Sequence, residues 1–126
     1  MNKVLIRKQN QDFKIALVDD LSLEYMQEVV GGFIERVSFI DPLDELNIDM
    51  WANDGGKLID GLKPTFVVLD NKDKLVDIIM GDTIFTSRDR HGNTIGLNDM
   101  QIKIIKNHFK TAAILNDGTI ANVIKI

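Results

Sequence analysis

The chain has 126 residues, of which 44% are hydrophobic and 27% are charged, and its formal net charge is −4 at pH 7. These values are typical of a soluble globular protein with a real core, so we predict a single domain over residues 1–126. The absence of cysteine excludes disulfides and thiolate metal sites and fits a reducing cytoplasm. No apolar run approaches the ~20 residues of a membrane-spanning helix, so we expect no membrane association.

Charge is divided unevenly along the chain. Residues 1–85 carry nine Lys/Arg and sixteen Asp/Glu, a net −7, whereas residues 86–126 carry six and three, a net +3. The overall negative sign disfavours duplex-DNA binding, because contacts with phosphates supply much of the affinity for DNA. A local site for an anion in the last third of the chain is compatible with these numbers.

Two strands are predicted at the N-terminus, Lys3–Arg7 and Phe13–Val18. In the second strand apolar residues alternate with Lys14, as expected of a strand with one buried face. That face is formed by Phe13, Ile15 and Leu17.

Residues 21–40 predict a helix, a glycine stop and a strand. Ser22 is placed to cap the first turn of the helix, whose apolar stripe repeats at i, i+3 and i+7. The stripe consists of Leu23, Met26 and Val30. Gly31 suits a left-handed C-cap, because it has no Cβ to oppose a positive φ. After Gly32 the apolar period changes to two, and the face of the strand consists of Phe33, Val37 and Phe39.

The middle of the chain is interpreted from its turns. Asp41-Pro42 breaks the chain, and Leu43–Asn47 reads as an acidic connector. A strand follows at Ile48–Asn53 and ends in Asn53-Asp54-Gly55-Gly56, which is typical of a hairpin turn whose glycines supply positive φ. The alternative is an anion site made by exposed backbone amides of this turn and the side chain of Lys57.

Further strands are predicted after this turn. Phe66–Leu69 is either a buried strand or one helical turn, and Ile78–Ser87 is a strand or a bent strand interrupted at Gly81. Arg88–Asn93 then forms the loop of a hairpin, and Thr94–Leu97 is its return strand.

A second helix begins after Asn98, which with Gln101 has the spacing of a capping box. Its buried stripe consists of Ile102, Ile105 and Phe109. The tail predicts a hairpin of two strands, Thr111–Leu115 and Thr119–Ile126, joined by an Asn-Asp-Gly turn. Together these elements predict the α+β class, with a mainly antiparallel sheet, two short helices and a C-terminal hairpin. A homodimer formed through the C-terminal helix or hairpin is compatible with this pattern.

Three segments resemble the motifs of a domain-of-unknown-function family that is common in phage and mobile-element proteins. The motifs are a helix ending in V-G-G-x-I-E, then N-x-x-G-K-L followed by G-L, then D-x-I-x-G, and they correspond here to residues 25–37, 53–64 and 77–81. The resemblance covers about residues 3–109 and leaves residues 110–126 as a C-terminal hairpin extension. One residue is inserted between Leu58 and Gly61, and Thr65-Phe66 stand where the family usually has an Asn after the proline. The resemblance implies a phage or mobile-element accessory protein in the cytoplasm of a host cell, and it implies no particular reaction.

The strongest candidate site is a basic cluster. Three lysines recur at i, i+3 and i+7 on the second helix and so share one face, and the preceding hairpin adds two arginines, a histidine and an asparagine. Phe85 is available to stack on a base, Asn93 to read its polar edge, and the cations to hold phosphates. The predicted ligand-binding residues are Phe85, Arg88, Arg90, His91, Asn93, Lys103, Lys106 and Lys110. The alternative is an ordinary solvated helix face.

The family resemblance implies a phage or mobile-element protein that acts against host defence, and the basic cluster favours an anionic ligand, so we expect a non-enzymatic binding protein that counters host defence by sequestering a small anionic nucleotide. A protein inhibitor of a host enzyme is the alternative, because residues 19–60 hold eleven Asp/Glu against two Lys/Arg, a set that can attract a basic partner. A metal-dependent enzyme comes third, since Asp12-Phe13-Lys14 has the D-x-K spelling of some nucleases. His91 and His108 are isolated and are expected on the surface or in loops. We therefore predict no catalytic residue, no metal and no cofactor.

Overall fold

The computed structural model describes residues 1–38 and 40–126, and the side chains of all of these except residues 41 and 42. The expected strand residue Phe39 therefore lies outside the described part. The elements, in chain order, are β1 Asn2–Arg7, β2 Lys14–Val18, α1 Leu23–Val30, β3 Ile34–Arg36, α2 Asp41–Glu45, β4 Ile48–Asn53, the 3-10 turn η1 Gly56–Leu58, β5 Pro64–Leu69, β6 Leu75–Met80, β7 Thr83–Arg88, β8 Thr94–Ile95, α3 Asp99–His108, β9 Ala112–Ile114 and β10 Ile120–Lys125.

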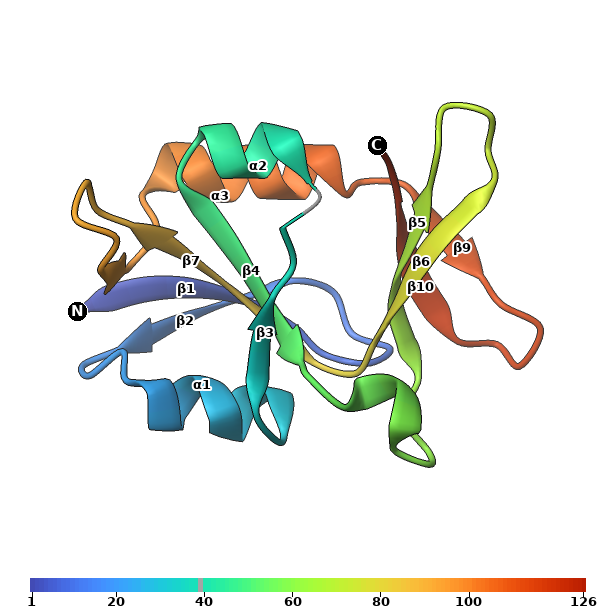
Figure 1. Ribbon diagram of the computed structural model, residues 1–126, viewed down its shortest axis with the longest axis horizontal. Helices are drawn as coiled ribbons and strands as arrows, with labels where there is room; N and C mark the ends of the chain where they lie inside the picture. Colours follow the sequence, from blue (N-terminus) through green and yellow to red (C-terminus); the bar gives the residue numbers. More distant parts are fainter. Residues whose placement is uncertain (39) are drawn as a thin grey trace.

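The strands form two sheets that lie side by side (Figure 1). Sheet A has the order β2-β1-β7-β4-β3, with β8 paired to β7, and all its pairings are antiparallel. Sheet B has the order β6-β5-β10-β9, in which β10 runs parallel to β5 and the other pairs are antiparallel. The α+β class with mainly antiparallel strands is therefore confirmed, although the strands form two sheets rather than one.

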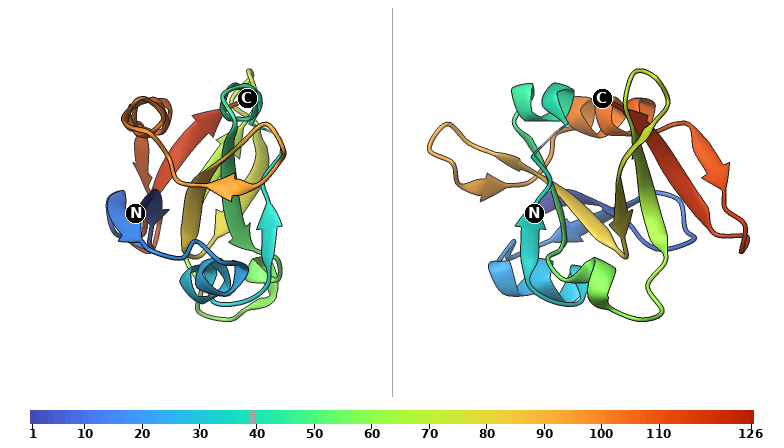
Figure 2. Two further views of the ribbon diagram at one scale, coloured as in Figure 1. Left: turned by 90° about the vertical axis from the view of Figure 1, so that its left-hand side faces the viewer. Right: turned by 45° about the vertical axis from the view of Figure 1, so that its right-hand side comes forward.

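The helices and the two sheets pack around two hydrophobic cores. Helix α1 covers one face of sheet A, where Met26 and Val30 pack with Val4, Ile6 and Ile84. The larger core lies on the other face of sheet A, beneath α3 and against sheet B (Figures 1 and 2). At its centre four aromatic rings lie with their centroids 4.9–6.2 Å apart. These rings belong to Phe13, Phe66, Phe85 and Phe109.

The ends of α1 and α3 follow from local sequence. The Ser22 side chain accepts a hydrogen bond from the backbone N–H of Tyr25 at 3.1 Å, and Gly31 takes the left-handed cap at φ 78°. At α3, Asn98 and Gln101 form both hydrogen bonds of the capping box. The predicted starts of both helices and the glycine end of α1 are confirmed. They could be predicted because each capping bond joins residues at most four positions apart.

Several expectations about the elements are wrong. The connector at Leu43–Asn47 belongs largely to a third helix, α2, since a proline suits the first turn of a helix as well as a chain break. The segment Ile78–Ser87 is split between β6 and β7, which lie in different sheets, and Gly81 turns the chain between them at φ 84°. In β2 the exposed face carries Ile15 and Leu17, because Ala16 and Val18 face the core under α1.

Among the described residues, no helix is long and apolar enough to cross a membrane. The segment after residue 110 is not peripheral to the fold. β10 lies between β5 and β9, and its residues Ala121 and Ile124 are buried, so this segment fills the interior of sheet B.

Candidate functional site

The predicted base-stacking residue, Phe85, is fully buried. It lies on β7 in the centre of sheet A, with 0% exposure, and its ring packs edge-on against Phe66 and Phe109. The prediction that it stacks on a ligand base is therefore wrong. The sequence predicts that Phe85 lies on a strand, but it does not tell whether this side chain meets solvent or a second sheet.

Arg88 is occupied by two carboxylates of its own chain. Its Nη1 lies 2.6 Å from Oδ1 of Asp49, and its Nη2 lies 3.0 Å from Oδ1 of Asp44. Asp49 is only 4% exposed and also lies 3.5 Å from Nη1 of Arg36. A buried carboxylate of this kind needs its cations, so Arg88 acts in the fold, and its predicted role as a phosphate ligand is not supported.

The other predicted loop residues surround Asp89. The Asp89 carboxylate accepts hydrogen bonds from the backbone N–H groups of His91 and Asn93, both at 2.9 Å, and from Nδ2 of Asn93 at 3.1 Å. These bonds hold the pKa of Asp89 below its usual value. The Asn93 amide thus fastens the loop, while the side chains of Arg90 and His91 extend into solvent.

Helix α3 carries two of the three predicted lysines, Lys103 and Lys106, and Lys110 follows its C-cap residue Phe109. Lys103, Lys106 and Lys110 are all exposed, and none pairs with a carboxylate among the described side chains. The ten residues of α3 span about 15 Å at 1.5 Å per residue. Lys103 and Lys106 therefore lie about one turn apart on the exposed side of the helix, and the prediction that Lys110 belongs to the same helical face is wrong, because the helix ends at His108.

The acidic and basic parts of the chain interleave in space. Ion pairs join Arg88 to Asp44, Lys125 to Asp73, and Lys63 to Asp117. Each of these pairs links residues 1–85 with residues 86–126, so the charge difference along the sequence does not become two opposed surfaces.

His108 lies in the last turn of α3 and is half-buried, so its expected place on the surface or in a loop is wrong. Its Nε2 is buried without a hydrogen-bond partner in the described part of the chain, and burial lowers its pKa. No group of three or more His, Cys, Asp or Glu side chains among the described residues is arranged to hold a metal ion.

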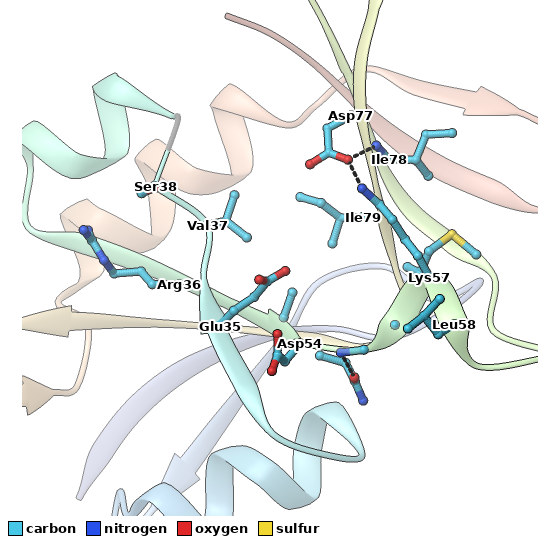
Figure 3. Close-up of a pocket in the computed structure, with 15 residues that line it drawn as sticks. Glu35, Arg36, Val37, Ser38, Asp54, Lys57, Leu58, Asp77, Ile78 and Ile79 are labelled. Carbon is cyan, nitrogen blue, oxygen red and sulfur yellow. Dashed lines mark hydrogen bonds and ion pairs between the residues drawn. The ribbon is translucent and has the colours of Figure 1, made fainter.

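The best-formed cavity is a cleft between the two sheets, of about 410 Å³ (Figure 3). Strands β3 and β4 form one wall, β6 forms the other, and η1 lies between them at one end. The three segments that carry the family resemblance meet at this cleft. Its lining consists of Glu35, Arg36, Val37, Ser38, Ala52, Asn53, Asp54, Gly55, Gly56, Lys57, Leu58, Asp77, Ile78, Ile79 and Met80.

One corner of the cleft is built by Asn53. Its Nδ2 donates to the C=O of Val30 at 3.1 Å, and its Oδ1 accepts from the N–H of Gly55 at 2.8 Å. A Cβ on Gly32 would lie 2.8 Å from this Nδ2, so glycine is needed for the approach. The glycine and asparagine of the first two motifs thus join the end of α1 to the end of β4.

A second contact fixes the opposite wall. Nζ of Lys57 pairs with Oδ1 of Asp77, and the same carboxylate oxygen accepts from the backbone N–H of Ile78 at 2.8 Å. Lys57 is thereby neutralised, which argues against the anion site considered for it. The hairpin-turn interpretation is also wrong, because neither Gly55 nor Gly56 has a positive φ, and the chain enters η1 there.

The remaining charge in the cleft is negative. Figure 3 shows the Glu35 and Asp54 side chains turned toward the same space, whereas Arg36 points away from it. Arg36 pairs with Asp44 and Asp49, and Lys57 pairs with Asp77. Glu35 and Asp54 form no ion pair with any described side chain, so the cleft favours a cationic group. Sequence reasoning missed this site because its two walls meet only in the folded chain.

Comparison with curated proteins and with solved structures finds no match to either. A family model does match, over residues 1–110, and its description is Domain of unknown function (DUF3846). The match ends before β9 and β10, although these strands complete sheet B. Because it spans most of the chain, the protein belongs to this DUF3846 family.

Proposed function

We propose that this protein is a non-enzymatic binding protein of phage or mobile-element origin whose ligand occupies the cleft between the two sheets. The observation that carries the proposal is the pair of carboxylates at Glu35 and Asp54, which face the cleft without an ion-pair partner among the described side chains. Carboxylates that face a cavity unpaired are available to a ligand, whereas those already paired serve the fold. The origin rests on the family resemblance of the sequence.

The test is retention of a ligand during purification. Tagged wild-type protein and the double variant Glu35→Gln/Asp54→Asn are purified from a bacterial lysate. Native mass spectrometry then measures the mass of each intact complex, which also gives the oligomeric state of the protein. We expect a stoichiometric bound species with the wild type that is absent from the double variant. Glu28→Gln/Glu45→Gln removes two exposed carboxylates that do not line the cleft and should keep the species. Equal retention by both double variants would contradict the proposal.

A second candidate function is sequestration of an anionic nucleotide that signals in host defence, with its phosphates on the lysines in α3 and just after it. The exposed, unpaired set of Lys103, Lys106 and Lys110 favours it, since ammonium groups bind phosphates as point charges. A nucleotide panel in native mass spectrometry tests it against the triple variant with glutamate at these three positions. Glutamate at Lys8, Lys72 and Lys74 changes the net charge equally elsewhere and is the matched control. Binding lost only in the first variant supports this candidate, and the absence of any binding contradicts it.

Inhibition of a host enzyme through an acidic surface is the remaining candidate. Asp44 and Asp49 are paired with arginines, so reversing their charges would disturb the fold. Exposed Glu24, Glu28 and Glu45 make the sharper test. A stoichiometric host protein lost on lysine substitution at these three positions would favour this candidate.

A further inference from the structure

Strand β3 presents a free edge beside the cleft. Among the residues that the structure describes, it is the last strand of sheet A and pairs only with β4. Val37 N–H donates to Met50 C=O at 2.9 Å, and Asp54 N–H donates to Phe33 C=O at 2.8 Å. In an antiparallel pair such bonds alternate along the strand, so the backbone groups of Ile34 and Arg36 point away from β4. Figure 2, left, shows β3 at the outer margin of the sheet.

One backbone donor on the edge of β6 across the cleft is already occupied. The backbone N–H of Ile78 is bound by the Asp77 carboxylate, which Lys57 holds in place. A charged side chain placed over a sheet edge is a common device against the addition of another strand. A new strand therefore meets less competition at β3 than at β6.

The side chains on the cleft face of β3 set the chemistry of such a strand. Phe33, Glu35 and Val37 share this face, since residues two apart in a strand point the same way. Phe33 is 76% exposed, an unusual position for an aromatic side chain, Glu35 carries an unpaired carboxylate, and Val37 is half-buried. Cross-strand neighbours on one face lie about 5 Å apart at Cβ. Apolar residues suit the positions beside Phe33 and Val37, and a basic residue suits the position beside Glu35.

We infer that the cleft binds an extended peptide segment of a partner protein, which adds to the free edge of β3 and carries the pattern apolar-x-basic-x-apolar. Backbone hydrogen bonds to Ile34 and Arg36 hold the segment, and alternate side chains give specificity. The basic side chain enters the cleft toward Glu35 and Asp54, where a guanidinium or ammonium group balances the negative charge. The pattern reads the same in both directions, so it applies to parallel and antiparallel addition. This inference rests on the proposed function and names the ligand class of the same site.

The test begins with selection of random heptapeptides from an mRNA-displayed library on the full chain. Enrichment of Arg or Lys flanked at both second neighbours by apolar residues is the expected result, and enrichment without a basic residue would overturn the inference. The probe for measurement is fluorescein-labelled Thr-Val-Thr-Arg-Thr-Val-Thr, with Glu in place of Arg as its matched control. By fluorescence anisotropy we expect the Arg peptide to bind at least tenfold more tightly than the Glu peptide.

Variants of the protein locate the contact. Glu35→Gln keeps the shape of the side chain and should weaken the Arg peptide about tenfold, whereas Glu45→Gln on α2 should leave its affinity unchanged. Amide hydrogen exchange by NMR should slow at Ile34 and Arg36 in the complex, because those amides gain partners. Protection at Ile78 with none at Arg36, or an unchanged affinity in Glu35→Gln, would overturn strand addition at β3.

Spermidine, a cation without a peptide backbone, separates this inference from the proposed function. If spermidine perturbs the resonances of Glu35 and Asp54 but neither the selected peptides nor the Arg peptide bind, the cleft is a site for small cations and the peptide inference fails alone. If spermidine and the peptides leave these resonances unchanged and the lysate experiment yields no cleft-dependent species, both fail together.

Discussion

Arg7 and Asn122 join the two sheets through a direct hydrogen bond, in which Nε of Arg7 on β1 donates to Oδ1 of Asn122 on β10 at 2.7 Å. Arg7 is only 2% exposed, and it also donates to the backbone C=O groups of Ile120, at 2.9 Å, and of Lys8. Nδ2 of Asn122 in turn donates to the C=O of Phe109 at 2.7 Å. The buried guanidinium thus connects sheet A, sheet B and the end of α3.

Replacing Arg7 by Met should lower the free energy of unfolding by about 3 kcal/mol, because three partly buried acceptors lose their donor. Urea denaturation followed by circular dichroism measures the change. Arg90→Met removes an exposed arginine and should alter stability by no more than about 0.5 kcal/mol. Similar losses in both variants would show that the network around Arg7 contributes no particular stability.

A chain that stops at Lys110 should not fold cooperatively. It lacks β9 and β10 and exposes Phe66 and Val68, which are fully buried against them and the larger core. Thermal unfolding and binding of a hydrophobic dye are the measurements, with a broad transition and strong dye binding expected. A chain that stops at Lys125 keeps β10 and should unfold as the full chain does. A sharp transition in the shorter chain would contradict the assignment of β10 to the core.

The glycines of the cleft should differ in their tolerance of alanine. Gly32→Ala places a Cβ 2.8 Å from Nδ2 of Asn53 and should cost about 2 kcal/mol of stability, since the hydrogen bond to Val30 must shift. Gly55→Ala meets its nearest atom at 3.7 Å and should change stability little. Urea denaturation of the two variants compares them directly. Equal effects would mean that the contact with Asn53 adapts freely.

Stability should depend on His108 at mildly acidic pH. Burial lowers the pKa of His108 below its usual value of 6.5, so the unfolded chain takes up this proton at a higher pH than the folded chain does. The contribution is therefore complete above pH 6.5 and is lost as the pH falls below 6.5 toward the lowered pKa. Urea unfolding as a function of pH should show this slope in the wild type and in His91→Gln, but not in His108→Gln.

Loss of stability at still lower pH has another cause. Hydrogen bonds and ion pairs lower the pKa values of Asp89, Asp99 and Asp117 below their usual 3.8. Their contributions are present above pH 3.8 and disappear as the pH falls through the lowered values. These carboxylates act independently of His108, so the His108 variant should retain this second loss.

Local signals in the sequence predicted local structure well. Ser22, Gly31, Asn98 and Gln101 define helix ends through bonds to residues a few positions away, and the structure contains each of these bonds. The same local signals do not predict which strands pair when those strands lie far apart in the sequence. The sequence of Ile78–Ser87 predicts a strand or a bent strand, but it does not show that β6 and β7 belong to different sheets.

The candidate site shows the same division. Helical spacing alone predicts that Lys103 and Lys106 share a face of α3, but it does not show that the helix ends at His108, before Lys110. Arg88 was predicted as a ligand residue because sequence spacing does not reveal its partners, Asp44 and Asp49, which lie about forty positions earlier. The cleft needed β3 and β6 to come together, and only the folded chain brings Glu35 opposite Asp77.

The position of β10 also constrains when the chain can finish folding. Until residues 120–125 have left the ribosome, β5 has only β6 beside it and offers an open edge for aggregation. The hydrogen bond from Arg7 to Asn122 then joins residues 115 positions apart in the sequence. Contacts between residues so distant in the sequence form slowly. A nascent chain paused before β10 should therefore depend on chaperones that shield exposed strands.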